Sequence, residues 1–470
     1  MVRAVCSNAK FQKKTGVVSV GKYFGTDGVR GVANVELDAL LAFRIGAAAA
    51  TVLTEERNGQ GNGKAKILIG KDTRMSSDML ENALVAGVCS VGAEVELLGV
   101  IPTPAIAYLT IKHRADAGVV ISASHNSYEY NGIKIFAGSG YKLSDALEEK
   151  IEYLIDHMEL VPKASHDKLG RVLRSEIDPV VEYTDHLAST IKGDLSGLRV
   201  AFDCANGASS TTIKRLARLL EIKADIRYYE PDGININDGC GSTHLEKLQE
   251  RVRNGNYDCG IAFDGDADRC LVVDETGEVL DGDRIMAVCA ARMQEEGRLR
   301  DGAFVATVMS NMGLHAYARA HNMRIETANV GDRYVLEMML EKGYILGGEQ
   351  SGHVIFLEFA STGDGELTAI QFLQILRSSG KKCSEIASEV MPWPQVLINV
   401  KVPNDKKHHV AELPEVAEVI EQEKSHMGEG RVLVRASGTE ALVRVMVEGV
   451  NKDAVEKAAK VIAEAIAQID

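Results

Sequence analysis

The stretch Lys66-Ile-Leu-Ile-Gly-Lys-Asp-Thr-Arg74 begins a pattern of a short apolar strand, a polar loop and a helix. The pattern occurs three times, at residues 66–91, 198–220 and 304–321, and in the second unit the helix is expected over about residues 210–220. Strands that alternate with helices pair mostly in parallel and form α/β units. The three units therefore predict an α/β protein with three similar mixed α/β domains.

The last part of the chain has a different order of elements. Residues 396–402, 430–434 and 442–447 read as strands, and a helix with Ala and Ile on one face follows at residues 453–467. This order predicts a C-terminal α+β domain. Trp393, between two prolines, is predicted to pack at the hinge before it.

Length and charge narrow the class of protein. A chain of 470 residues exceeds the roughly 250–300 residues at which a single core stops growing. We place four domains at residues 1–176, 177–278, 279–391 and 392–470. The net charge of −14 argues against a nucleic-acid partner, and no apolar stretch approaches the about 20 residues of a membrane span.

The cysteines and the N-terminal segment favour the cytoplasm. The eight cysteines are scattered without a CxxC pair, which excludes a disulfide framework or a zinc site of the usual spacing. Cys204, Cys259 and Cys270 lie in or beside apolar strands, so we expect them in the core. The first 20 residues lack the apolar core of a signal peptide.

An acidic loop joins two apolar strands at residues 264–269, Asp-Gly-Asp-Ala-Asp-Arg. Its three carboxylates, those of Asp264, Asp266 and Asp268, would repel one another and cost several kcal/mol if they were desolvated without a partner. A divalent cation removes this repulsion, and an all-oxygen ligand set suits Mg²⁺. The loop therefore predicts one magnesium site per chain.

Two other structures compete for this loop. An acidic surface turn conflicts with the apolar residues on both sides. An EF-hand template has acidic residues at positions 1, 3, 5 and 12, and the chain has them there: Asp264, Asp266, Asp268 and Glu275. Position 6 of the template requires Gly but is Arg269, and residues 274–277 read as a hairpin turn, so the EF-hand is rejected.

A second polar loop follows the apolar residues 117–121. It reads Ser122-Ala-Ser-His-Asn126 and precedes Asn131-Gly-Ile-Lys-Ile-Phe136. Loops of small residues at strand ends are where α/β folds place reactive groups. From residue type alone, Ser124 is more often a turn or helix-cap residue than a nucleophile.

Five segments, in this order along the chain, resemble the α-D-phosphohexomutase superfamily. ISASHN with NGIKIF resembles its phosphoserine loop, DGDADR its metal loop, and GGEQSGH at residues 347–353 its sugar-recognition loop. RASGTE at residues 435–440 resembles its phosphate-binding loop, and FGTDGVRG at residues 24–31 its amino-terminal signature. The forms FGTDGVRG and GEQSGH resemble the phosphoglucosamine mutase branch in particular.

The resemblance implies a four-domain, heart-shaped architecture and an isomerase that is an intramolecular phosphotransferase. A phosphoserine at Ser124 would interconvert glucosamine 6-phosphate and glucosamine 1-phosphate through glucosamine 1,6-bisphosphate. The product would feed UDP-N-acetylglucosamine and cell-wall precursor synthesis. A monomer or homodimer is expected, and its partner is a small phosphosugar. The alternative within the family is a phosphomannomutase/phosphoglucomutase.

The resemblance also assigns site residues. It implies that Ser124 and the three aspartates hold the metal, and that Lys134, Arg30 or His353 transfers the proton. Sugar and phosphate contacts fall to eight residues: Arg269, Glu349, Ser351, Arg435, Ser437, Gly438, Thr439 and Arg333. By type alone, Lys134 is equally a solvent-facing strand lysine, Arg30 a partner of Asp27 and Arg333 a partner of Asp332.

Two positions depart from the family pattern. The family usually has proline where this chain has Ser127 and Ala441. Proline fixes φ at about −65°, so its loss affects loop rigidity more than chemistry. Two other classes stay open: a metal-dependent phosphatase with Asp264 as nucleophile, and a non-catalytic metal- or sugar-binding protein.

Overall fold

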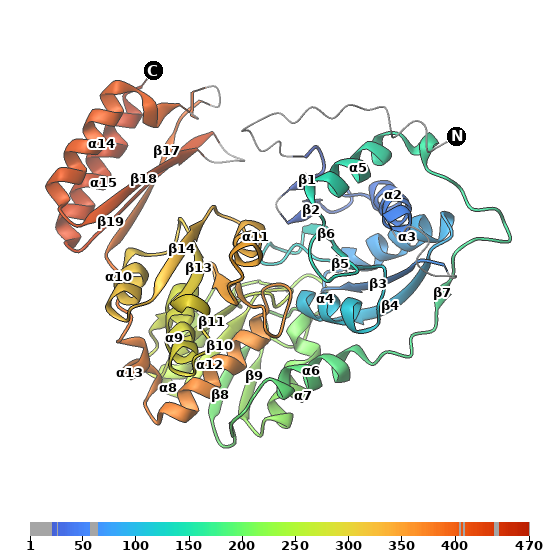
Figure 1. The fold of residues 1–470 in the computed structure, drawn as a ribbon, viewed down its shortest axis with the longest axis horizontal. Helices are drawn as coiled ribbons and strands as arrows, with labels where there is room; N and C mark the ends of the chain where they lie inside the picture. The colour runs from blue at the N-terminus through green and yellow to red at the C-terminus, as the bar shows by residue number, and fades with distance from the viewer. Residues whose placement is uncertain are drawn as a thin grey trace.

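Four β-sheets organise the chain, which a computed structural model describes for residues 21–25, 27–56, 64–403, 406–407, 409–436 and 441–469. The sheets have seven, five, four and three strands and lie in sequence order along the chain, and each defines a domain, numbered 1 to 4 (Figure 1). The predicted fold class, three mixed α/β domains followed by an α+β domain, is confirmed. No helix in the described part of the chain has the length and apolar character needed to cross a membrane.

Domain 1 has a seven-stranded sheet in the order β1-β2-β6-β5-β3-β4-β7. Its strands are β1 (Phe24–Gly25), β2 (Gly28–Val32), β3 (Lys66–Lys71), β4 (Glu94–Val100), β5 (Ala117–Ile121), β6 (Tyr130–Ala137) and β7 (Val172–Leu173). Its helices are α2 (Ala39–Glu56), α3 (Ser76–Ser90), α4 (Thr103–Lys112), α5 (Asp145–Asp156) and the 3-10 turn η1 (Met158–Leu160).

Domain 2 has the strand order β12-β11-β10-β8-β9. Its strands are β8 (Arg199–Asp203), β9 (Lys223–Arg227), β10 (Cys259–Phe263), β11 (Cys270–Asp274) and β12 (Val279–Leu280). Its helices are α6 (Pro179–Ser189), η2 (Ala208–Thr211), α7 (Ile213–Leu219) and α8 (Glu246–Asn254).

Domain 3 has the strand order β14-β13-β15-β16. Its strands are β13 (Ala303–Thr307), β14 (Arg324–Ala328), β15 (Leu346–Gly348) and β16 (Val354–Phe356). Its helices are α9 (Gly282–Glu295), η3 (Arg300–Gly302), α10 (Met312–Ala320), α11 (Asp332–Lys342), α12 (Gly365–Ser379) and α13 (Cys383–Ala387).

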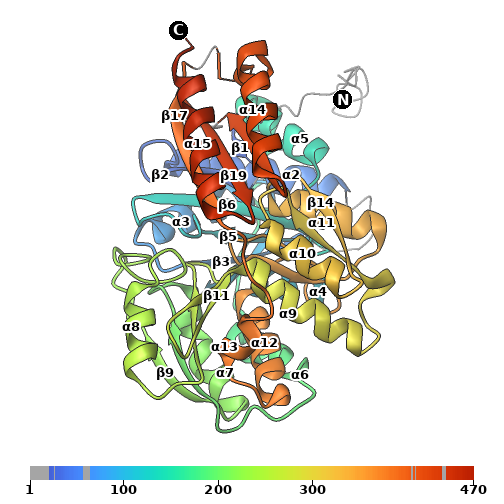
Figure 2. The same cartoon turned by 90° about the vertical axis from the view of Figure 1, so that its left-hand side faces the viewer.

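Domain 4 has three antiparallel strands, β17 (Gln395–Lys401), β18 (Gly430–Ala436) and β19 (Leu442–Gly449), in the order β17-β19-β18. Helices α14 (Pro414–Met427) and α15 (Lys452–Ala467) pack together beside this sheet, and η4 (Val410–Glu412) precedes them (Figures 1 and 2). Helix α14 was not anticipated from the sequence.

One correction concerns the second repeat. The helix expected over residues 210–220 is instead a 3-10 turn, η2, followed by the two-turn helix α7. The interruption falls at Thr212, whose hydroxyl donates to Ser209 O and to Glu366 Oε1 of domain 3. The sequence around Thr212 could not predict this contact, because Glu366 belongs to a different domain.

Apolar packing unites the first three domains and leaves the fourth separate. A single buried cluster includes Phe136 of domain 1, Phe202 of domain 2 and Phe356 of domain 3. Domain 4 has its own core around Val445 and Ile462. The expected core cysteines Cys204, Cys259 and Cys270 are buried and unbridged.

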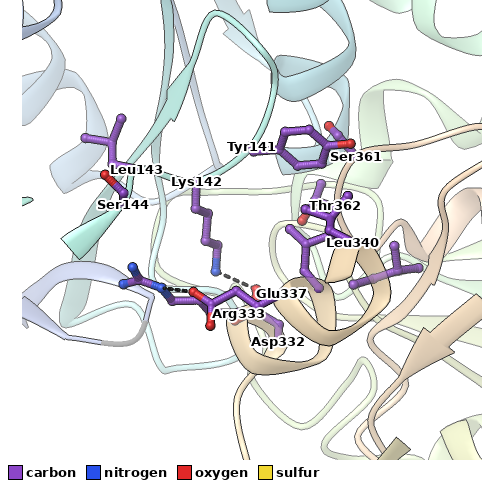
Figure 3. Close-up of a pocket in the computed structure, with 12 residues that line it drawn as sticks. Tyr141, Lys142, Leu143, Ser144, Asp332, Arg333, Glu337, Leu340, Ser361 and Thr362 are labelled. Atoms are coloured by element: carbon purple, nitrogen blue, oxygen red, sulfur yellow. Dashed lines mark hydrogen bonds and ion pairs between the residues drawn. The ribbon is translucent and has the colours of Figure 1, made fainter. Parts of the chain in front are cut away.

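The hinge before domain 4 is held by polar contacts. Asn311 Oδ1 accepts a hydrogen bond from Trp393 N (2.8 Å), and Asn311 Nδ2 donates to Trp393 O (3.1 Å). Domains 1 and 3 meet at a cavity of about 180 Å³, where Tyr141 and Lys142 face Asp332 and Leu340 of helix α11 (Figure 3).

Candidate active site

Three of the recognised loops occupy the same topological position. In domains 1 to 3 the core strands have the order second-first-third-fourth, and the fourth strand runs antiparallel to the third. The loop between the third and fourth strands contains Ser124 in domain 1, the three aspartates in domain 2 and Glu349 in domain 3. Since β5 and β10 are buried along their whole lengths, their ends fix where these loops begin.

Ser124 meets the acidic loop across the boundary between domains 1 and 2. Its Oγ donates a hydrogen bond of 2.5 Å to Asp264 Oδ2 and lies 3.3 Å from His125 Nδ1. The side chain is 1% exposed, and φ is 53°, a left-handed conformation that costs a non-glycine residue of order 1–3 kcal/mol. The surrounding structure must hold this loop in place.

Two residues that sequence analysis missed hold it. Arg74 Nη2 donates to Ser124 O (2.9 Å) and Asn126 O (2.8 Å), and Nη1 donates to Ser127 O. Asn237, from domain 2, donates to the same Ser124 O and Asn126 O, each at 2.9 Å. The only sequence signal was the position of Arg74 in the first strand–loop–helix unit.

Glycine permits the close approach of the two loops. A Cβ at Gly265 would lie 2.6 Å from Ser124 O, nearer than real Cβ contacts allow. Ala208, the first residue of η2, donates its N–H to Gly265 O at 2.8 Å and so also restrains the acidic loop. The glycine between Asp264 and Asp266 is therefore required by packing.

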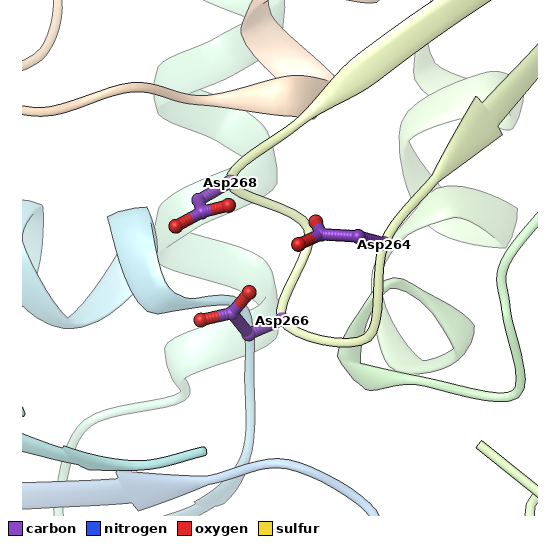
Figure 4. Close-up of side chains that lie close together, drawn as sticks. All are labelled: Asp264, Asp266 and Asp268. Carbon is purple, nitrogen blue, oxygen red and sulfur yellow. The ribbon is translucent and has the colours of Figure 1, made fainter. Parts of the chain in front are cut away.

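The three aspartates form a group that could hold a metal ion (Figure 4). One carboxylate oxygen from each lies within 4.8 Å of the others, and all three residues are buried. Burial, then the neighbouring charges of Asp268 and Asp266, raise the pKa of Asp264 well above its usual value. Such crowding of like charges is unfavourable unless a cation or a proton neutralises it.

The donor set fits a hard divalent cation. Asp266 Oδ1 and Asp268 Oδ1 are buried and accept no hydrogen bond from any described residue. Buried carboxylate oxygens without donors are costly, and an all-oxygen group of this kind matches the ligands that Mg²⁺ prefers.

Lys134 is not a solvent-facing strand lysine: it is 2% exposed. Its Nζ lies 2.8 Å from Asp266 Oδ2, 3.0 Å from Asp27 Oδ2 and 3.4 Å from Asp268 Oδ2. Burial lowers its pKa, but the charges of Asp266, Asp27 and Asp268 outweigh burial and raise the pKa well above its usual value. The ammonium group therefore keeps its proton beside the acidic loop.

Arg30 forms the ion pair with Asp27 that sequence left as an alternative, and it also lines the cleft. Burial raises the pKa of Asp27, but Lys134, Lys142 and Arg30 outweigh it and lower the pKa well below its usual value. Asp27 thus stays ionised among three cations.

His353, from the third loop, lies on the other side of Asp268. Its Nδ1 is 3.7 Å from Asp268 Oδ2, and its Nε2 is 3.6 Å from Asp332 Oδ2. Burial lowers its pKa, but the carboxylates of Asp268 and Asp332 outweigh burial and raise the pKa to about 9. By contrast, burial and the nearby arginines lower the pKa of His125 to about 4, so that ring is neutral.

The remaining assigned residues divide into two groups. Arg269 and Glu349 line the same cleft, and Glu349 Oε1 accepts a hydrogen bond from Gly331 N (3.1 Å); Ser351 is exposed in the same loop. Arg333 points elsewhere: it pairs with Asp145 and Glu148 of helix α5, and with Glu337, rather than with Asp332 (Figure 3).

Domain 4 contributes Arg435, on β18 opposite Arg444 of β19. Burial and the neighbouring guanidinium of Arg444 lower the pKa of Arg435. Like charges directly opposite each other on adjacent strands are destabilising. The other expected phosphate contacts, Ser437, Gly438 and Thr439, lie outside the described residues.

An open cleft of about 520 Å³ lies among these loops. Its lining comes from domains 1, 2 and 3 and includes Arg30, His125, Asp268, Arg269, Glu349 and His353. This volume suits a small polar ligand, and the guanidinium groups of Arg30 and Arg269 offer contacts to an anionic one.

Known proteins resemble this chain over nearly its whole length. The family described as phosphoglucomutase/phosphomannomutase matches in four parts: alpha/beta/alpha domain I at residues 21–161, domain II at 181–277, domain III at 281–393 and the C-terminal domain at 397–465. A phosphoglucosamine mutase of Acetivibrio thermocellus is 54% identical and covers 94% of this chain and 97% of its own length. One from Clostridium novyi is 52% identical, with 95% and 99% covered.

Solved structures share the fold. A phosphoglucomutase/phosphomannomutase family protein of Burkholderia thailandensis has a TM-score of 0.77 at 20% identity and covers 94% of this chain and 96% of its own. An N-acetylphosphoglucosamine mutase of Aspergillus fumigatus, in complex with GlcNAc-6P and magnesium, has a TM-score of 0.69 at 18% identity, with 99% and 98% covered. The expected four-domain phosphohexomutase architecture is confirmed.

Proposed function

Because this chain belongs to the phosphoglucomutase/phosphomannomutase family, we propose that it is a phosphoglucosamine mutase. It is an isomerase that interconverts glucosamine 6-phosphate and glucosamine 1-phosphate, and so supplies UDP-N-acetylglucosamine and cell-wall precursors. Relatives that are 51–54% identical over nearly the full chain carry that name, and support this substrate over neutral hexose phosphates.

One observation carries the proposal. Ser124 Oγ, held in a strained loop, donates to Asp264 within a group of three aspartates, of which Asp268 lines the cleft together with Arg30 and Arg269. A serine that carries a phosphoryl group beside a cation site suits transfer of that group to a sugar hydroxyl and back.

The chemistry at Ser124 is an exchange of one phosphoryl group. A sugar hydroxyl attacks the phosphorus of phospho-Ser124, the bond between phosphorus and Oγ breaks, and a bisphosphosugar forms. The hydroxyl proton passes to Oγ, directly or through a side chain. After the sugar turns over in the cleft, Oγ attacks the phosphorus of its other phosphoryl group, the bond between that phosphorus and the sugar oxygen breaks, and the proton of Oγ passes to that oxygen as the isomeric monophosphate leaves.

Mg²⁺ is the metal we propose, held by Asp264, Asp266, Asp268 and an oxygen of the phosphorylated Ser124. When bound, it would draw charge from the transferring phosphoryl group. The chain's own cations surround the same point. Despite burial, the neighbouring carboxylates raise the pKa of Lys134 well above its usual value and that of His353 to about 9, so both side chains are suited to stabilise, as cations, an oxygen that gains charge. His353, with the pKa nearer neutrality, is the better suited of the two to exchange a proton. Arg30 is placed to contact the transferring group from the amino-terminal segment.

The other loops would bind the sugar ring and the phosphate that does not react. Glu349 and Ser351 would accept and donate hydrogen bonds at the ring hydroxyls, while Arg269 orients the phosphoryl group. Arg435, with Ser437, Gly438 and Thr439, would hold the phosphate that does not react. Arg333 pairs with Asp145 and Glu148, which favours a role at the contact between domains 1 and 3.

The direct test combines mass and turnover. Purified wild-type protein should contain a fraction that is heavier by one phosphoryl group on Ser124, and it should convert glucosamine 1-phosphate when a bisphosphosugar is present. Ser124→Ala should lack the heavier species and retain less than about a hundredth of the turnover, equivalent to about 2.7 kcal/mol in the barrier.

Ser122→Ala is the matched control, because Ser122 lies in the same loop and contacts Ser124 N through its Oγ without facing Asp264. It should keep the phosphoserine. Release of inorganic phosphate without mutase turnover would instead support the phosphatase class, and binding without turnover would support a non-catalytic protein.

A further inference from the structure

Six charged side chains of alternating sign form a closed ring at the cleft. In order they are Asp268, Lys134, Asp27, Lys142, Asp332 and His353. Domain 1 provides three of them, domain 3 two, and the acidic loop of domain 2 the one that closes the ring. The mechanism above uses every member except Asp27, Lys142 and Asp332.

Lys142 is the link between the domains in this ring. Its Nζ lies 2.5 Å from Asp27 Oδ1 in domain 1 and 2.5 Å from Asp332 Oδ2 in domain 3 (Figure 3). The side chains of Lys142 and Asp332 are 14% and 16% exposed, so solvent screens the pair only weakly. A cation shared by two mostly buried carboxylates has little freedom to shift.

Asp332 passes this restraint to the sugar loop by two routes. His353 Nε2 is 3.6 Å from Asp332 Oδ2. Asp332 is also the first residue of helix α11, and the preceding Gly331, at φ 127°, donates its N–H to Glu349 Oε1 at 3.1 Å. A shift of Asp332 would therefore move both a proton donor and the carboxylate that reads the sugar.

At its other end, Lys142 restrains the residues around Ser124. Asp27 contacts Lys142 through Oδ1 and Lys134 through Oδ2, 3.0 Å from its Nζ. Lys134 in turn reaches Asp266. The contacts of Lys142 therefore restrain the distance between the Ser124 loop, which would hold the phosphoryl donor, and the sugar loop at Glu349, which would hold the acceptor.

We propose that Lys142 and Asp332 are positioning residues for phosphoryl transfer, which hold the sugar loop of domain 3 in register with the Ser124 and metal loops. Lys142 contacts Asp27 and Asp332, and Asp332 contacts His353, so they act on the reaction through these partners. Their effect is geometric, and a misplacement of about 1 Å is enough to slow such a reaction about a hundredfold. The proposal rests on the proposed function for its kinetic readout.

The kinetic test uses the full-length phosphorylated enzyme. Lys142→Met should lower kcat by about ten- to a hundredfold and change KM for glucosamine 1-phosphate by less than about threefold, with phosphoserine content unchanged. Lys142→Arg should recover most of kcat, because a guanidinium can also bridge two carboxylates. Asp332→Asn keeps the volume of the side chain and provides a second variant should Lys142→Met fold poorly.

Glu148→Gln is the matched control. It weakens a second contact between domains 1 and 3, in which Arg333 pairs with Glu148 as well as with Asp145, and leaves the ring intact. Its kcat should stay within about twofold of wild type. An equal loss of kcat in Glu148→Gln and Lys142→Met would mean that contact between the domains in general matters, and it would overturn the proposal. A wild-type kcat in Lys142→Met or in Asp332→Asn would overturn it as well.

Hydrogen–deuterium exchange gives a readout that needs no turnover. Lys142→Met should increase exchange at residues 330–336 and 349–353, while Glu148→Gln leaves residues 349–353 unchanged. A lack of mutase activity in the wild-type protein would overturn the proposed function, but the exchange data would still test this proposal. Unchanged exchange at residues 330–336 and 349–353 in Lys142→Met would refute it.

Discussion

Ser124 Oγ lies 2.5 Å from Asp264 Oδ2, although the two residues are 140 positions apart and belong to different domains. The loops after β5 and β10, which contain these residues, have the same position in two similar sheets. Asp264 can therefore accept a hydrogen bond from the serine and, with Asp266 and Asp268, provide oxygens for a cation next to it.

Asp266→Asn should weaken Mg²⁺ binding at least about tenfold and lower activity with it, because the substitution removes one of three anionic ligands from a site that needs all-oxygen coordination. Isothermal titration of the dephosphorylated protein measures the affinity directly. The control is Asp203→Asn, which alters a buried aspartate of domain 2 outside the group. Normal affinity in Asp266→Asn would rule out the site.

Arg74→Gln should lower both kcat and stability. It removes the donors to Ser124 O and Asn126 O, and it leaves buried Asp72 without its cation, a loss of about 3–5 kcal/mol in comparable pairs. Arg284→Gln is a suitable comparison, because Arg284 is also buried and donates to Val279 O and Ala387 O away from the cleft. That variant should lose stability and keep kcat per folded molecule. Equal kcat values in the two variants would show that Arg74 acts on stability alone.

Glu349 should govern the choice of sugar. We expect kcat/KM to be highest for glucosamine phosphate, lower for glucose phosphate and lowest for mannose phosphate, whose C2 substituent is axial. A carboxylate near the C2 ammonium group contributes about 1.5–3 kcal/mol, or roughly ten- to a hundredfold. Glu349→Gln should remove most of this preference, while its Oε1 can still accept from Gly331 N. Equal turnover of mannose phosphate by wild type would move the protein to the phosphomannomutase/phosphoglucomutase alternative.

Asp203 should make stability fall as pH rises from about 4 to about 6. Burial raises its pKa to about 6 in the folded protein, whereas an unfolded chain loses this proton at about pH 4. Between these values the folded state binds more protons, so its stability is highest below about pH 4 and decreases up to about pH 6. The change is about 2–3 kcal/mol.

The measurement is the apparent Tm of wild type minus that of Asp203→Asn across this range. Other carboxyl groups titrate in both proteins and cancel in the difference. Asn keeps the acceptor for Ala205 N, which lies 2.9 Å from Asp203 Oδ1. A difference that does not vary with pH would show that Asp203 ionises normally in the folded protein.

Much of the fold could be predicted because its signals are local. The strand–loop–helix units at residues 66–91 and 304–321 follow from hydrophobic period and from glycine-bearing loops, and the structure has β3, α3, β13 and α10 there. The second unit was only partly right, because a contact from Thr212 to Glu366 of domain 3 interrupts its helix. A segment's own propensity cannot include a partner that is 154 positions away.

The sequence by itself determined the acidic loop and the small-residue loop with Ser124, because crowded carboxylates between apolar strands and a reactive serine at a strand end are properties of short segments. Only the tertiary structure decided what surrounds them: that Lys134 is buried against Asp266, that Arg74 and Asn237 hold the Ser124 loop, and that Lys142 bridges Asp27 to Asp332, 190 positions away. The physical reason is that a side chain's charge partners depend on how three similar sheets pack, and that packing is fixed by an apolar core shared among domains 1, 2 and 3 rather than by any local pattern.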